Sequence, residues 1–145
     1  MTFYCFDESK WPFVILTIDG RPSSEDDFKL FLKEWEKFFF QSMQKGERFK
    51  LMFDVRKADV SLNSDLIIYA HLMTQWLKNV EFLIKSWMDR TAIIVSTKTM
   101  REFVRFIISM KPPARPYRIF SEKELNVVME WLNKPLDSSA ETNQQ

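Results

Sequence analysis

Apolar residues alternate along this chain between short continuous runs and a helical spacing of three to four residues. The runs are rich in β-branched side chains and stop at polar or turn-forming residues, as buried strands do. They lie at residues 13–18, 49–55, 91–96 and 117–120. Residues 2–6 predict a further strand at the sheet edge, antiparallel to the strand that follows it.

Between these strands the apolar spacing predicts helices, each of which buries one face. They are expected from Ser24 to Gly46, over residues 64–86 and 98–111, and after Ser121. Ser24 and the acidic residues behind it are typical of a helix start, and Gly46 is typical of a helix end. The order ββαβαβαβα predicts an α/β fold with a mainly parallel five-stranded sheet and an antiparallel N-terminal edge strand.

The length of 145 residues and the hydrophobic content of 46% fit one folded domain, expected over residues 1–134. The remaining residues, 135–145, are almost entirely polar, and we expect a disordered tail there. No stretch approaches the roughly 18 uncharged apolar residues of a membrane span. These features lead us to expect a cytoplasmic location.

Several kinds of chemistry are excluded or disfavoured by composition. One Cys cannot form an internal disulfide framework, and one His cannot build a multi-histidine metal centre. Two Gly are too few for a glycine-rich phosphate loop. A net charge of +1 gives no general attraction to nucleic acid. We therefore expect no catalytic residues, no cofactor, no metal and no nucleic-acid partner.

Three segments carry a resemblance to a known family. They are Phe53-Asp-Val-Arg56 leaving a strand, residues 90–96 feeding a helix, and residues 115–120 feeding the last helix. With the order of elements, they make the chain similar to STAS-type domains, above all to their SpoIIAA-like branch, which is described alongside the lipid-binding CRAL-TRIO fold. The resemblance spans about residues 10–133.

This resemblance implies a non-catalytic, regulatory domain that binds a partner protein or a small ligand. In family members that antagonise anti-sigma factors, phosphorylation of a serine at the start of a helix switches partner binding. Ser61 and Ser64 fall near that position in this chain, although the family's Asp-Ser-Ser-Gly string is absent. A phosphorylation-switched antagonist acting through Ser61 or Ser64 is therefore one hypothesis.

The helices predicted at 64–86 and 98–111 carry more apolar residues than a single buried face requires. The surplus side chains are Tyr69, Leu72, Trp76, Val80, Phe103, Phe106 and Ile107. Lys98, Arg101 and Arg105 would form a basic rim beside them. Neighbouring helices could simply cover these side chains. Alternatively, the surplus forms a surface for a partner protein or a second copy, or encloses a hydrophobic, lipid-like ligand. The basic rim also suits peripheral contact with an anionic membrane.

Overall fold

The computed structural model describes residues 2–61 and 64–135. Its sheet has five strands in the order β1-β2-β3-β4-β5. The strands are β1 (Tyr4–Lys10), β2 (Phe13–Gly20), β3 (Phe49–Ala58), β4 (Met88–Val95) and β5 (Tyr117–Ser121). β1 runs antiparallel to β2, and the remaining neighbours are parallel. The predicted α/β fold with an antiparallel N-terminal edge is confirmed.

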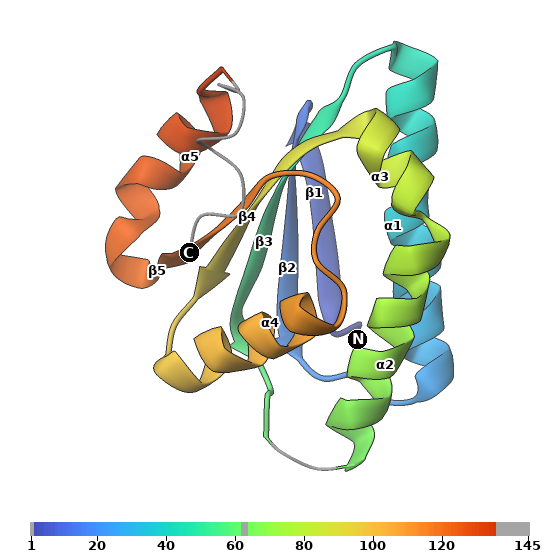
Figure 1. The fold of residues 1–145 in the computed structure, drawn as a ribbon, viewed down its shortest axis with the longest axis vertical. Coiled ribbons are helices and arrows are strands. Elements are labelled where there is room, and N and C mark those ends of the chain that lie inside the picture. The colour runs from blue at the N-terminus through green and yellow to red at the C-terminus, as the bar shows by residue number, and fades with distance from the viewer. Residues whose placement is uncertain (1, 62–63, 136–145) are drawn as a thin grey trace.

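Helices cover both faces of this sheet, but unequally (Figure 1). They are α1 (Glu25–Lys45), α2 (Ser64–Asn79), α3 (Glu81–Trp87), α4 (Lys98–Met110) and α5 (Leu125–Asn133), the last preceded by the 3₁₀ turn η1 (Glu122–Glu124). The parallel strands follow one another in chain order, so right-handed crossovers place α1 to α4 on the same face. Among the helices of the described residues, α5 alone lies on the opposite face (Figure 1).

The predicted helix starts and stops are present as hydrogen-bonded caps. The Ser24 hydroxyl accepts a 3.1 Å hydrogen bond from the Asp27 backbone N–H at the start of α1. Gly46 ends this helix in the left-handed region at φ 64°, where a residue without Cβ is least strained. Thr97 caps α4 in the same way as Ser24, accepting from the Met100 N–H at 3.1 Å.

The single helix predicted over residues 64–86 is wrong, because the chain forms α2 and α3 instead. The backbone leaves helical geometry at Val80, with φ −103° and ψ 12°. Asn79 and Val80 both have low helix propensity, and the Val80 side chain is 5% exposed. Burial of Val80 fixes the bend between the two helices.

The alternation of side chains along the strands builds two separate cores. The larger one lies between the sheet and α1 to α4 and holds most of the aromatic residues, including Phe31, Trp35 and Phe39. The smaller one lies beneath α5 and joins Ile94 and Phe120 of the sheet to Trp131. In the described part of the chain, no helix combines the length and the apolar character that crossing a bilayer requires.

Candidate functional site

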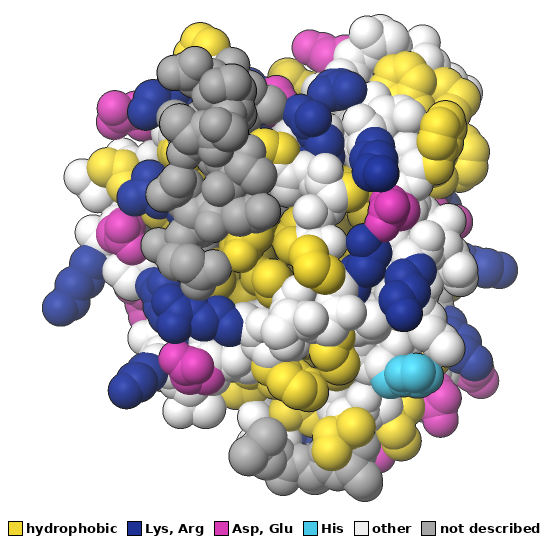
Figure 2. Space-filling model, in the orientation of Figure 1, with side chains coloured by type: hydrophobic (Ala, Val, Ile, Leu, Met, Phe, Trp, Pro, Cys, Tyr) yellow, Lys and Arg dark blue, Asp and Glu magenta, His cyan; other side chains and the backbone are white. Residues whose placement is uncertain are grey.

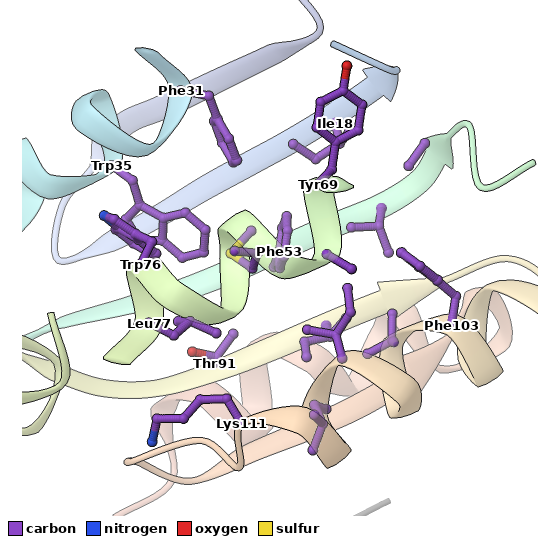
Figure 3. Close-up of a pocket in the computed structure, with 18 of the residues that line it drawn as sticks. Ile18, Phe31, Trp35, Phe53, Tyr69, Trp76, Leu77, Thr91, Phe103 and Lys111 are labelled. Carbon is purple, nitrogen blue, oxygen red and sulfur yellow. The ribbon is translucent and has the colours of Figure 1, made fainter. Parts of the chain in front are cut away.

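An apolar pocket lies within the larger core, between α2, α4 and the sheet (Figure 3). Its volume of about 240 Å³ far exceeds the roughly 10–15 Å³ that one water molecule needs. The strands supply its floor and the two helices supply its walls. Typical lining residues are Phe53, Val55, Ile93, Met73, Leu77 and Val104.

The wall formed by α4 is incompletely buried. Of the residues of α4, Met100 alone is fully buried. Phe103, Val104, Ile107 and Ile108 line the pocket and are only half-buried. Val104 and Ile108 also pack against the larger core, whereas Phe103 and Ile107 are not part of that cluster.

The wall formed by α2 is held firmly by aromatic packing against α1. The rings of Trp76 and Trp35 lie 4.8 Å apart between centroids, and the Trp76 Nε1–H donates a 2.8 Å hydrogen bond to Glu36. Trp35 also packs edge to face against Phe53 of the pocket floor, with 5.6 Å between the ring centroids. These contacts fix one side of the pocket while the α4 side remains loosely packed.

Polar groups gather at the two ends of the pocket. Tyr69 and Phe103 lie toward one end in Figure 3, and Lys111 lies at the other. At the Tyr69 end, Arg21 and Asp59 form a 2.9 Å ion pair. The hydrogen bond from Arg21 is the largest of several effects that hold the pKa of Asp59 far below its usual range.

The opposite end holds an ion-pair triad at the junction of α3 and α4. Glu81 accepts a hydrogen bond from the Lys111 ammonium group and lies 3.4 Å from that of Lys85. The hydrogen bond from Lys111 is the main reason why the pKa of Glu81 lies below its usual value. Arg115 lines the same end and donates to the Asp89 carbonyl oxygen at 3.3 Å.

The structure separates the apolar residues selected from the sequence into three groups. Tyr69, Trp76, Phe103 and Ile107 line the pocket. Leu72 packs half-buried against the larger core and Val80 is buried within it. Phe106 is 51% exposed on the outer side of α4. The pocket thus brings together part of the set, whereas a surface partner could not reach Val80.

The proposed basic rim lies away from this pocket. Lys98 and Arg101 border a separate cleft at the carboxyl ends of β4 and β5, beside Ser96 and Ser121. Arg105 lies 3.4 Å from Glu102, one turn away on the exposed side of α4. The three cations therefore surround the start and the outer face of α4.

Of the two candidate phosphorylation sites, Ser61 has a described side chain and Ser64 does not. The Ser61 side chain is exposed, and its hydroxyl donates a 2.6 Å hydrogen bond to the Asp59 carboxylate that Arg21 also contacts. The side chain of Ser64 lies outside the described residues, as does the predicted tail from residue 136 onward.

The sequence does not predict which charged groups meet at the ends of the pocket. Glu81 and Lys111 are thirty positions apart in the chain, and no spacing rule connects them. Thr91 begins the strand predicted at residues 91–96, and in the structure its side chain lies on the pocket floor (Figure 3). A polar residue within an apolar strand was the one signal that could have marked this floor.

No family model, curated protein or solved structure matches this chain. The resemblance to STAS-type domains therefore stays a prediction from the sequence.

Proposed function

We propose that this protein binds a hydrophobic small molecule in the pocket between α2, α4 and the sheet. The observation that carries the proposal is the apolar face of α4, where Phe103 and Ile107 remain half-buried beside a cavity of about 240 Å³. An apolar ligand would complete the packing that the chain itself leaves unfinished.

The energetics of apolar burial support this proposal. Each Å² of apolar surface removed from water stabilises a complex by roughly 25 cal/mol. A ligand that covers the apolar walls of this cavity would therefore gain binding free energy. The rigid Trp76 wall adds to this because a preformed site loses little conformational entropy on binding. The loosely packed α4 side supplies a route of entry.

Binding without catalysis fits the residues that line the pocket. No Ser, Cys or His belongs to its described lining, so those residues supply neither a serine or cysteine nucleophile nor a histidine base. The charged groups lie at the ends, and the middle is apolar. Such a site holds and orients a ligand, as a carrier or a sensor does.

A neutral fluorescent probe tests the proposal directly. N-phenyl-1-naphthylamine brightens in apolar surroundings, and we expect wild-type protein to bind it with saturation. Phe103→Asp places a charge in the pocket and should abolish the brightening. Phe106→Asp is the matched control, because Phe106 lies on the same helix but is 51% exposed and does not line the pocket.

Cooperative urea unfolding of both variants would show that the fold is retained. Equal loss of probe binding in both variants, or no saturable binding by the wild type, would contradict the proposal. A native mass spectrum compared with a denaturing one would then show whether protein made in cells carries a molecule of a few hundred daltons.

Self-association or binding of a partner protein is a second candidate function. It is favoured by large apolar side chains that stay exposed, namely Phe82 at 78%, Ile67 at 67% and Phe106 at 51%. A doubled mass in the native spectrum that Phe82→Asp returns to a single chain would support it. Retention of the doubled mass in that variant would remove Phe82 from the interface.

A further inference from the structure

The two ends of the apolar pocket carry opposite excess charge. This difference bears on the chemistry of the ligand, and the inference drawn from it rests on the proposed function. An apolar middle admits any hydrophobic molecule of suitable size, so discrimination must come from the ends.

The Lys111 end is cationic. Four cations, Lys85, Lys111, Arg48 and Arg115, gather there with two carboxylates, those of Glu81 and Asp89. Arg48 donates to the Lys85 and Ser86 carbonyl oxygens and so brings no carboxylate of its own. Figure 2 shows the same imbalance, with several Lys and Arg side chains and few acidic ones over α3 and the loop after α4.

Arg115 is a cation of this end whose pKa lies below its usual value. Burial lowers its pKa, and repulsion from Arg48 lowers it further, while Asp89 only partly compensates. An additional negative charge beside Arg115 would stabilise the charged guanidinium and so offset the effects of burial and of Arg48. The Asp89 carboxylate is itself engaged by Arg90, 3.1 Å away.

The Tyr69 end has the opposite balance. Arg21 is paired with Asp59 there and also lies within electrostatic range of Asp65. Glu25 and Asp27 act on the hydroxyl of Tyr69, whose pKa is raised by burial first and then by Asp65. An anionic group would be repelled from this end, while a hydrocarbon end would be tolerated.

We propose that the ligand is a single-chain amphiphile with one anionic head group, such as a long-chain carboxylate, whose head lies at Lys111 and Arg115 and whose tail runs toward Tyr69. The Thr91 hydroxyl lines the same end and has no hydrogen-bond partner among the described residues, so it is available to the head group. The length of the pocket agrees with an extended tail. α2 lines it from Leu66 to Leu77, about 16 Å at 1.5 Å per residue.

Glu81 of the ion-pair triad also competes with the head group for Lys111. In the unliganded protein Glu81 pairs with the ammonium group of Lys111, whose side chain is 18% exposed. A bound carboxylate would share or replace Glu81. Removal of the Glu81 charge is therefore expected to strengthen the binding of an anion, the opposite of what general damage to the pocket would do.

The test compares dodecanoate, 1-dodecanol and dodecyltrimethylammonium, each below its micelle concentration, by displacement of N-phenyl-1-naphthylamine at low salt. We expect dodecanoate to bind about tenfold more tightly than dodecanol, the scale of a charge-assisted contact. Lys111→Met should remove most of this preference, and Glu81→Gln should increase it. Lys85→Met removes a cation that pairs with the same carboxylate but does not line the pocket, so it should reduce the preference less than Lys111→Met does.

The outcomes separate this inference from the function on which it rests. Equal binding of dodecanoate and dodecanol, or tightest binding of the cationic amphiphile, would overturn the anionic head group and leave hydrophobic binding intact. A preference that survives both Lys111→Met and Arg115→Gln would overturn its position. Failure of all three amphiphiles and of the neutral probe would overturn the proposed function itself, and this inference with it.

Discussion

The guanidinium group of Arg90 donates a 2.8 Å hydrogen bond from Nη1 to the backbone carbonyl oxygen of Trp131. The Arg90 side chain is 2% exposed, and its guanidinium lies 5.5 Å from the centre of the Trp131 ring. This contact joins β4 to the last helix. It explains how a helix of nine residues stays fixed on the second face of the sheet.

We expect Arg90→Met to lower the free energy of unfolding by about 2–4 kcal/mol, because it leaves a buried carbonyl oxygen without its donor. Urea unfolding measures this change, and Lys123→Met is the control because Lys123 is exposed on the turn before α5. A loss no larger than that of the control would mean that α5 is held by apolar packing alone.

Much of the fold could be predicted because its signals are local. Strand composition, helical spacing and the caps at Ser24 and Gly46 act within a few residues, and each led to the correct element. The break at Val80 was missed because the apolar spacing continues through it. Only the burial of Val80 in the folded chain fixes that bend.

The candidate site could be predicted only in part. The surplus of apolar residues on two helices was visible in the sequence, but the rotation of each helix decides which surplus residues face a cavity. Tyr69 and Trp76 both belong to this surplus, yet Trp76 is buried against α1 while Tyr69 remains half-buried at the end of the pocket where Arg21 and Asp59 pair. The charges at Glu81 and Lys111 meet only through the tertiary fold.

Trp76 should therefore behave as a core residue. We expect Trp76→Ala to cost about 3–5 kcal/mol of stability, as truncation of large buried aromatic residues does. Phe106→Ala, at an exposed position on α4, should change stability by less than about 0.5 kcal/mol. Chemical denaturation of the two variants distinguishes these values. A small loss for Trp76→Ala would show that this wall of the pocket is not firmly packed.

Filling the pocket from within should raise stability and prevent binding at once. Val104→Phe adds an aromatic ring to the half-buried face of α4, and cavity filling of this kind contributes about 0.5–2 kcal/mol. We expect a higher midpoint of thermal unfolding together with weaker binding of N-phenyl-1-naphthylamine.

Met110→Phe is the control for that substitution, since Met110 is 38% exposed on the same helix and does not line the pocket. It should leave probe binding unchanged. If Val104→Phe destabilises the protein and still binds the probe as the wild type does, the cavity beneath α4 is not the binding site.

Acid should weaken the fold in part through Asp54, which lies in the segment Phe53-Asp-Val-Arg56. Its carboxylate accepts hydrogen bonds from the Arg56 backbone N–H at 3.1 Å and from the Arg56 Nη2 at 2.7 Å. Burial opposes ionisation of Asp54, but these bonds outweigh it, so its pKa lies below the ordinary value of 3.8.

Because this pKa is lower in the folded than in the unfolded chain, the ionised Asp54 contributes stability that is fully present above about pH 5. The contribution fades as the pH falls toward the folded pKa. Asp54→Asn should therefore be less stable than the wild type at neutral pH, and the difference should shrink as the pH falls below about 4. Urea midpoints measured across this range give the comparison.

Glu130→Gln removes an exposed carboxylate from α5 and should keep a nearly constant, small offset from the wild type. If the Asp54→Asn offset were equally independent of pH, the pairing of Asp54 with Arg56 would contribute nothing to the acid sensitivity of the fold.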